Sequence, residues 1–378
     1  MDNLTHSLVG LTAAKAGLEK LSPGATALSI LAANSPDVDI VVLLFKGRWG
    51  YLHHHRGITH SLAGAAVLAF ALPLVFYLGD RLIAQIRKRE RRARLWGLLL
   101  VSILTTATHP LLDWSNNYGI RFFLPWNARW SYGDFTFVVD PFIWMVLGAV
   151  VFLMTAKTRA HVTFWLVIAL LPSFLIFSRL ATSGGSSVLL PLLWIVVLIV
   201  SVTLYRRGFG ERAGAKTAIA ALLVVMIYGS GLFVAHAAAL RRAKTEAAAI
   251  ANSHSESIIN LAAMATAADP TGWVCVMKTD RATYRFTLSL LRDLPASSAF
   301  VRYENLDGIE ARTAVDAERD YRAQAFLGFA RFPVMRVIGE DCLTQTLVQF
   351  ADLRYTEPGN GRGTFSLDVP VDCPLHDR

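Results

Sequence analysis

Charged residues are scarce in this chain of 378 residues, of which only 17% are Asp, Glu, Lys or Arg, while 54% are hydrophobic. An ordinary soluble domain carries about 25% charged residues. The deficit therefore argues against a soluble globular protein and favours one embedded in a membrane. The net charge of +9 must then be interpreted by position, because basic residues of membrane proteins gather in short cytoplasmic loops.

Cysteine is also rare, and its positions exclude a familiar class of metal site. Cys275, Cys342 and Cys373 all lie in the last third of the chain, and their spacing matches no zinc-binding motif. The start of the chain lacks the basic residues and the long apolar run of a cleavable signal peptide, since Asp2 and His6 interrupt it. We therefore expect no signal-peptide cleavage.

Long apolar runs take the place of the missing charge. A membrane-spanning helix needs roughly 20 apolar residues, and six stretches approach that length: 61–78, 95–112, 135–155, 162–177, 188–205 and 217–240. Two shorter runs, 4–18 and 25–33, predict helices joined by a Ser-Pro-Gly turn at 22–24. They form either a re-entrant or interfacial hairpin or a pair of short spans. The predicted fold is mainly α, with a polytopic helical membrane domain.

The basic residues of the membrane region fall in alternate loops. They follow the first, third and fifth predicted spans: Arg81, Arg87, Lys88, Arg89, Arg91, Arg92 and Arg94, then Lys157 and Arg159, then Arg206, Arg207, Arg212 and Lys216. Because such loops stay in the cytoplasm, we predict a multi-pass protein of the bacterial inner membrane whose region after residue 240 is extracytoplasmic. Nucleic acid is the less favoured explanation of the arginine cluster, and we expect no nucleic-acid partner.

The composition changes after residue 240. Charges of both signs appear, the apolar spans end, and short β-like runs recur at 272–277, 283–290 and 364–369. This region predicts a small α+β soluble domain, in which one disulfide is possible because the cysteines would face an oxidising space. We divide the chain into a metal-binding module over 1–150, additional transmembrane helices over 151–240 and an extracytoplasmic domain over 241–378.

A Thr-His-x-Leu pattern occurs three times, with its histidines at His6, His60 and His109. The first two copies extend to Thr-His-Ser-Leu-x-Gly. Their threonines are plausible N-caps, which would place each histidine in a first helical turn, and Pro110 is tolerated if it starts a new helical segment. Three histidines at corresponding places on separate helices can converge on one point, although so short a pattern also arises by chance.

Two carboxylates, Asp37 and Asp39, stand one residue apart in the sequence Ser-Pro-Asp-Val-Asp, between two apolar runs. Alternate residues of an extended segment share one face, so both side chains could reach one metal cluster. Acidic residues inside an apolar stretch are costly. This cost favours a paired or metal-bound role over the alternative, a hydrophilic turn after the proline.

The segment 53–61 reads His-His-His-Arg-Gly-Ile-Thr-His-Ser. Neutral imidazole is a common ligand of zinc and related metals, and a turn at Gly57 would let both His55 and His60 point inward. Arg56 offers a planar fork that suits phosphate or carboxylate. The alternative interpretation is a polar loop at the membrane surface.

His109 and Asp113 are four residues apart and share one face of a helix. This spacing suits two metal ligands, or one ligand with its orienting carboxylate. Asp140 lies near the outer end of the third apolar stretch. The loop charges, which involve no histidine, place His60, His109, Asp113 and Asp140 at the same outer surface.

A mixed set of nitrogen and oxygen ligands therefore suits zinc first, with manganese or iron as alternatives. The predicted metal ligands are His6, Asp37, Asp39, His55, His60, His109 and Asp113, with Arg56 and Asp140 as catalytic residues. The set is large enough for two or three ions, which together activate water and stabilise a phosphoester displacement. We predict hydrolysis of a phosphoester or lipid-linked substrate at the outer face, with membrane lipid as the partner. A metal transporter, or a structural metal site whose C-terminal domain binds a partner, is the alternative.

These elements in this order resemble the YdjM-type family, described as membrane-bound metal-dependent hydrolases. The matching elements are Leu-Thr-His-Ser-Leu at 4–8, Ser-Pro-Asp-Val-Asp at 35–39, His-Arg-Gly-Ile-Thr-His-Ser at 55–61 and His-Pro-Leu-Leu-Asp at 109–113. The resemblance covers residues 1–150, leaves the later spans outside and implies a hydrolase without naming its substrate. In the style of its site the chain is also similar to the superfamily of zinc-dependent phospholipase C and single-strand nucleases, which hold clustered zinc ions on helices.

Overall fold

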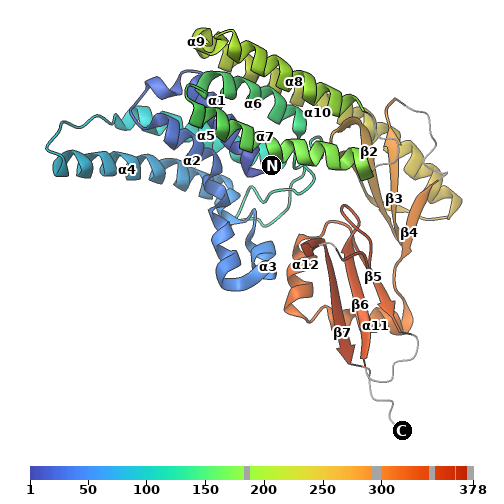
Figure 1. Cartoon of the computed structure of the whole chain (residues 1–378). Helices are drawn as coiled ribbons and strands as arrows, with labels where there is room; N and C mark the ends of the chain where they lie inside the picture. The colour runs from blue at the N-terminus through green and yellow to red at the C-terminus, as the bar shows by residue number, and fades with distance from the viewer. Residues whose placement is uncertain (183–187, 292–298, 340–344, 362, 373–378) are drawn as a thin grey trace. The chain divides into compact units, whose positions relative to one another are not determined.

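The computed structural model describes residues 1–182, 188–291, 299–339, 345–361 and 363–372. These residues form two compact units (Figure 1). The first unit, residues 1–38 and 58–233, is built from helices, and the second, residues 39–57 and 234–378, holds the described strands. The predicted fold class, mainly α with a small α+β domain, is confirmed.

A helix lies over each predicted span, although the helices over the third and fifth, Pro141–Thr155 and Leu190–Arg206, are shorter than the candidate spans. The helices of the first unit are α1 Asn3–Lys15, α2 Ala25–Asn34, α4 Leu62–Ile86, α5 Leu95–Trp114, α6 Pro141–Thr155, α7 Arg159–Thr182, α8 Leu189–Arg206, α9 Phe209–Arg212 and the first part of α10 Ala215–Ser253. Among the described residues, five stretches are long and apolar enough to cross a membrane: Ala25–His54, Leu62–Ile86, Leu95–Trp114, Arg159–Ser178 and Ala215–Ser253. The third predicted span starts later than expected, because α6 begins at Pro141 under a cap from Asp140.

Helices α1 and α2 form the hairpin that the sequence predicts. α1 contacts α2, α5 and α6. Gly10 permits the close approach of α2, since a Cβ there would lie 2.7 Å from the backbone oxygen of Ser29, whose hydroxyl donates to the Gly10 carbonyl. The indole of Trp144 on α6 donates to the Thr5 hydroxyl. The N-terminal helix is therefore held from both α2 and α6.

The N-caps predicted at Thr5 and Thr59 are wrong. Asp2 caps α1, and its carboxylate accepts both the N–H and the hydroxyl of Thr5. Ser61 caps α4, and its hydroxyl accepts the N–H of Gly64. Asp and Ser cap helices at least as well as Thr does, so local preference alone could not decide which residue begins each helix.

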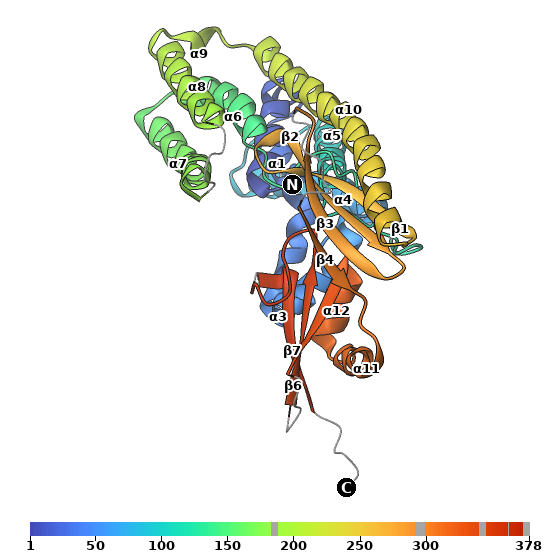
Figure 2. The same ribbon diagram turned by 90° about the vertical axis from the view of Figure 1, so that its right-hand side faces the viewer.

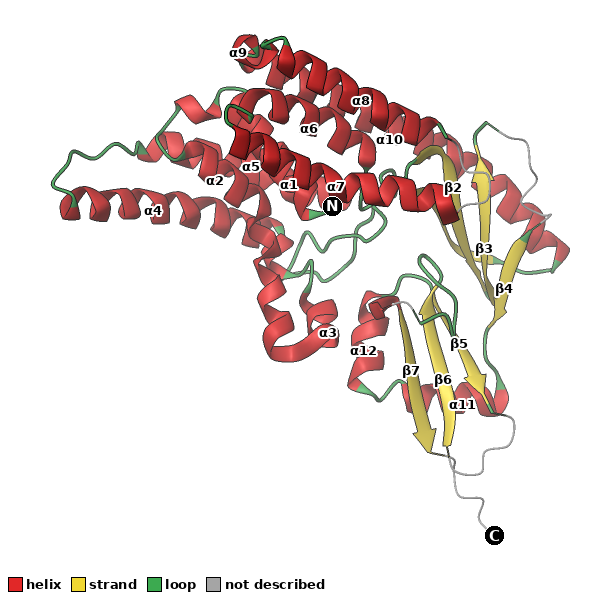
Figure 3. Cartoon of the chain, viewed as in Figure 1, coloured by secondary structure: helices red, strands yellow, loops and turns green. Residues whose placement is uncertain are grey.

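The second unit combines two antiparallel sheets with helices (Figure 3). One sheet has the strand order β1-β2-β3-β4 and the other β5-β6-β7. The elements are α3 Val42–His54, β1 Ile258–Thr266, β2 Asp269–Thr279, β3 Ala282–Ser289, β4 Phe300–Glu304, α11 Gly308–Ala317, α12 Tyr321–Phe329, β5 Pro333–Ile338, β6 Gln345–Asp352 and β7 Ser366–Asp372. The strands predicted at 272–277, 283–290 and 364–369 correspond to β2, β3 and β7.

The C-terminal half of α10 packs on the first of these sheets and leads into β1 (Figure 2). Ala239, Ala243 and Ala247 recur at every fourth position and are fully buried against Trp273 and Tyr284. Small side chains at this spacing give the helix a flat face that lies close to the sheet. α10 thus continues as one helix from the last predicted span to Ser253.

One cysteine of the predicted disulfide set lies in this core. Cys275 of β2 is fully buried, and burial raises the pKa of its thiol to about 12. A buried neutral thiol exchanges poorly with disulfides. Cys342 and Cys373 lie outside the described residues.

A buried ion pair joins the residues after α10 to the same sheet. The Glu256 carboxylate accepts hydrogen bonds from Thr279, Tyr284 and Arg302. Burial raises the pKa of this carboxyl, but the three donors together outweigh burial and hold the pKa below its ordinary 4.5. The charged pair therefore contributes stability above about pH 4.5 and loses it as the pH falls through the lowered pKa.

We expect Glu256→Gln to lower the free energy of unfolding by about 1–3 kcal/mol at neutral pH, because the amide removes the charged partner of Arg302. The deficit should shrink at an acidic pH well below 4.5, because the wild-type carboxyl is also protonated once the pH has fallen through its lowered pKa. Thermal unfolding of the full chain in detergent at both pH values measures the change. Glu310→Gln, at an exposed site on α11, is the control, and an equal deficit at both pH values would contradict the prediction.

Gly10→Ala should destabilise the first unit, which we call the membrane unit, by about 1–3 kcal/mol, because the added methyl group overpacks the contact with α2. Gly148→Ala is the matched control, since a Cβ at that helical glycine of α6 meets nothing within 4 Å. The apparent unfolding temperature in detergent should fall for the first variant and stay unchanged or rise for the second. Equal effects would show that the α1–α2 contact is not tight.

Candidate metal centre

Three histidines from separate segments meet inside the first unit. His6 comes from α1, His109 from α5, and His60 from a short 3-10 helix, Ile58–His60, that precedes α4. All three are fully buried. The rings of His6 and His109 stack with centroids 3.8 Å apart, and His60 approaches His109 edge-on at 4.9 Å. The three Thr-His-x-Leu copies therefore converge, as the sequence suggests.

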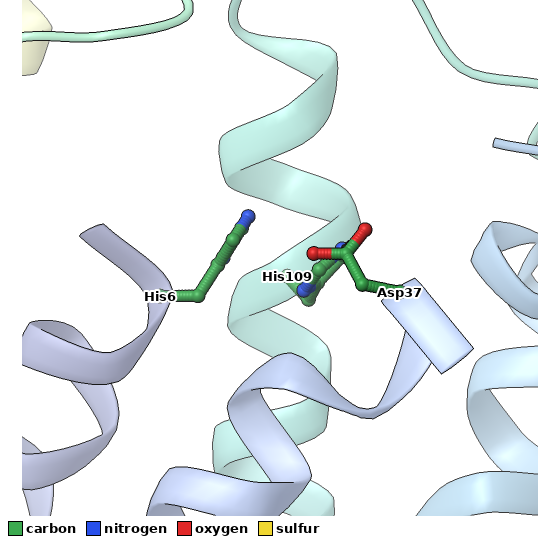
Figure 4. Close-up of side chains that lie close together, drawn as sticks. All are labelled: His6, Asp37 and His109. Atoms are coloured by element: carbon green, nitrogen blue, oxygen red, sulfur yellow. Dashed lines mark ion pairs between the residues drawn. The ribbon is translucent and has the colours of Figure 1, made fainter. Parts of the chain in front are cut away.

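Two carboxylates, Asp37 and Asp113, lie among these rings, and Figure 4 shows Asp37 close to His6 and His109. Asp37 Oδ1 lies 3.1 Å from His60 Nε2, and Asp113 Oδ2 lies 3.2 Å from His109 Nε2. Asp113 Oδ1 is 3.5 Å from His6 Nε2. The side chains form two overlapping sets, His6–Asp37–His109 and His60–His109–Asp113, whose ligand atoms lie within 4.8 Å of one another. Buried groups of this kind can hold a metal ion.

A hydrogen bond between His109 Nδ1 and the Ala33 carbonyl shows that the other ring nitrogen, Nε2, faces the centre with its lone pair. His109 Nδ1 lies 2.7 Å from the carbonyl oxygen of Ala33, and a carbonyl can only accept, so Nδ1 carries the proton. In the neutral ring Nε2 is then an acceptor, yet it faces carboxylate oxygens of Asp113 and Asp37 at 3.2 and 3.7 Å. Acceptors held this close need a cation between them, either a proton or a metal ion.

The two acids of the Ser-Pro-Asp-Val-Asp element contact different histidines. The segment Ser35–Val41 is a 3-10 helix and not the extended strand that the sequence suggests. With three residues per turn, residues two apart point in different directions. Asp37 accordingly reaches the histidines, whereas Asp39 reaches His55. The expectation of an extended segment is wrong, while ligation of one metal cluster by both acids remains a prediction.

Asp39, His55 and Arg56 interact within the segment 39–57, which belongs to the second unit. Asp39 lies 3.1 Å from His55 Nδ1, and its other oxygen accepts the backbone N–H of Arg56. Arg56 has a left-handed φ of 52° and is 3% exposed. Its predicted role in holding a phosphate remains a prediction, as does ligation by Asp39 and His55.

Asp140 is fixed as a helix cap. Its carboxylate accepts the N–H groups of Phe142 and Ile143 and the hydroxyl of Tyr228. It belongs to neither set of candidate ligand atoms. These contacts fix the start of α6, and its predicted catalytic role remains a prediction.

Pro110 does not start a new helical segment. α5 runs without a break from Leu95 to Trp114, so that expectation is wrong. The proline nevertheless leaves His109 and Asp113 one helical turn apart on the same face, as predicted, with His109 Nε2 3.2 Å from the Asp113 carboxylate. Pro110 is itself buried inside α5.

Sequence reasoning missed the groups that orient the site. The carbonyl of Ala33 and the amino group of Met1, which contacts Asp113, carry no side-chain signal and could not be found. The bond from Trp144 to Thr5 depends on tertiary packing. Asp2 was a candidate by residue type, since aspartate is a preferred N-cap, but Thr5 was an equally acceptable one.

Residues 1–238 match the family described as YdjM inner membrane protein. The chain belongs to this family. The match extends past residue 150 and includes α6, α7 and α8, so the narrower limit drawn from the motifs is corrected. Family and apolar helices together make this YdjM-family chain a multi-pass inner-membrane protein.

Two relatives share parts of the chain. Inner membrane protein YbcI of Escherichia coli (strain K12) is 32% identical over 141 residues, which cover 33% of this chain and 73% of the relative. Uncharacterized protein YfhP of Bacillus subtilis (strain 168) is 27% identical over 174 residues, which cover 43% of this chain and 49% of the relative. The chain thus spans about half the length of the Bacillus relative. No solved structure matches it significantly.

We expect His109→Ala to lower metal affinity by about 10–100-fold, the range seen when ligands or their orienting groups are lost. His53→Ala, at an exposed histidine of α3, should keep wild-type affinity. Elemental mass spectrometry and competition with a zinc indicator, on full-length protein purified without chelator, measure both. Equal metal content in the two variants would show that the buried histidines are not the ligands.

Proposed function

We propose that this protein is a membrane-embedded, metal-dependent hydrolase. Its metal would be held by His6, Asp37, His60, His109 and Asp113. The observation that carries the proposal is the lone pair of His109 Nε2, which faces two carboxylates in a buried site and so calls for a cation. The mixed nitrogen and oxygen donors suit zinc, with manganese or iron as alternatives, in two or three ions.

Bound metal would supply an activated water and stabilise the charge of a phosphoester displacement. The protein's own contribution is to hold the ligands in place. The Ala33 carbonyl orients His109, and the Thr59 hydroxyl lies 3.1 Å from His60 Nδ1. Burial of all three rings excludes bulk water from their side of the centre.

A catalytic site is favoured over a structural one by uneven exposure of the two carboxylates. Asp113 exposes 1% of its side chain, whereas Asp37 exposes 16%. A structural metal site closes its ligand shell, while a catalytic site keeps one position open to water or substrate. We infer that substrate and water approach from the side of Asp37.

The position of the centre along α5 supports an outer-face location. α5 begins at Leu95, directly after the basic loop 87–94, and His109 and Asp113 lie near its other end at Trp114. Basic loops stay in the cytoplasm, so the centre would open at the extracytoplasmic face. The C-terminal domain would lie on that same side of the membrane. The substrate class we propose is a phosphoester or a lipid-linked phosphoester in that leaflet.

The test is hydrolysis by the full-length protein in nanodiscs. Bis(p-nitrophenyl) phosphate serves as the soluble probe and phosphatidylglycerol as the lipid probe, each with added zinc or manganese. We expect turnover by the wild type and by His53→Ala, and its loss by at least about 100-fold in His60→Ala/Asp113→Ala, because two ligands are removed.

The outcomes separate the alternatives. Metal bound by the wild type without turnover of either probe would favour a structural site. Absence of stoichiometric metal after purification without chelator would overturn the hydrolase mechanism altogether.

A further inference from the structure

A run of large apolar side chains is exposed at the start of α3. We call the set Ile40, Val41, Leu43, Leu44 and Phe45 the α3 patch, and its members expose 56%, 44%, 42%, 79% and 82% of their surface. Contiguous apolar surface of this kind on a folded protein marks a site that another apolar surface covers.

The α3 patch belongs to a segment that composition alone assigns to a membrane span, Ala25–His54. The backbone contradicts that assignment. The 3-10 helix Ser35–Val41 interrupts the stretch, and Gly47 breaks α3 with a φ of 62°. The 13 residues of α3 reach about 20 Å even if straight, well short of the roughly 30 Å hydrocarbon core. α3 can enter a bilayer but cannot cross it.

The charge around the α3 patch has one sign. Lys46 and Arg48 follow it directly and are exposed, and no acidic residue occurs between positions 40 and 54. Such an apolar tip beside cationic side chains matches the boundary between acyl chains and anionic headgroups. A purely apolar protein partner would leave the two cations without complementary charge.

The part of α3 that follows the break at Gly47 is buried by protein. Trp49 and Leu52 are buried, and α3 contacts α12 within the same unit. The end of α3 is therefore packed on the C-terminal domain, while the α3 patch, which precedes Gly47, is left bare.

We propose that α3 is an interfacial membrane anchor. Leu44 and Phe45 enter the acyl region of the outer leaflet, Lys46 and Arg48 remain among anionic headgroups, and the contact with α12 holds the C-terminal domain at the bilayer surface. Contact of α3 with the bilayer requires neither a bound metal nor hydrolysis.

The test measures the depth of a nitroxide label on the full-length protein in nanodiscs that contain phosphatidylglycerol. Labels are placed by Phe45→Cys and, separately, Leu44→Cys, with Cys342 and Cys373 replaced by serine and buried Cys275 retained. The control label is Ile309→Cys on α11, a position that is 73% exposed. Power saturation compares accessibility to oxygen, which concentrates in acyl chains, with accessibility to a water-soluble nickel chelate.

We expect the labels at 44 and 45 to show a several-fold higher ratio of oxygen to nickel accessibility than the label at 309. Lys46→Gln/Arg48→Gln should move the label at 45 toward water in phosphatidylglycerol and have no effect in zwitterionic nanodiscs. An unchanged unfolding temperature in detergent shows that each variant is folded.

Two results would overturn the anchor. Equal accessibility ratios at 45 and 309 would place the α3 patch in water. Low accessibility to both reagents at 45, with dipolar broadening between labels, would show that a second copy of the chain covers the patch.

Discussion

Carboxylates buried against the lone pair of an imidazole impose the strongest constraint on the membrane unit. Asp113 is almost fully buried, and the His109 nitrogen that faces it at 3.2 Å is turned there by the Ala33 carbonyl. The Met1 amino group contacts the other oxygen of Asp113. Without a cation between them, the Asp113 oxygen and the His109 lone pair bring like partial charges together in a medium of low dielectric constant, where their repulsion is large. The fold of residues 1–114 can be understood as the scaffold that keeps these groups in register.

The repeated Thr-His-Ser-Leu-x-Gly element combines a candidate ligand, the histidine, with a glycine that allows close backbone packing. In both copies the histidine faces the centre and the glycine, four residues later, stands at a very close backbone contact. A Cβ at Gly10 would lie 2.7 Å from the Ser29 oxygen, and one at Gly64 would lie 1.8 Å from the Ile58 oxygen. A larger residue at either position would push the helix away and displace its ligand. The glycines therefore affect the geometry of the site because they allow the close backbone contacts that position its histidines.

The convergence of His6, His60 and His109 could be predicted from the repeated pattern that all three share. The loop charges independently placed His60 and His109 at one surface, but not His6. What the sequence could not reveal is the direction of each side chain. Asp37 and Asp39 are chemically equivalent in the sequence. Only the 3-10 turn directs Asp37 to His60 and Asp39 to His55. Thr5 and Asp2 are both acceptable caps, and tertiary contacts decide between them.

Hydropathy likewise could not distinguish a span from a surface helix, because both need apolar residues and differ in backbone continuity. α4 and α3 show the difference, since α4 continues for 25 residues while α3 breaks at Gly47. The segment that contains α3 leaves the membrane unit after Val38 and rejoins it at Ile58. Asp37 and His60 stand within two residues of those crossings. Chain connectivity thus couples the position of the segment to two candidate ligands, whatever covers the α3 patch.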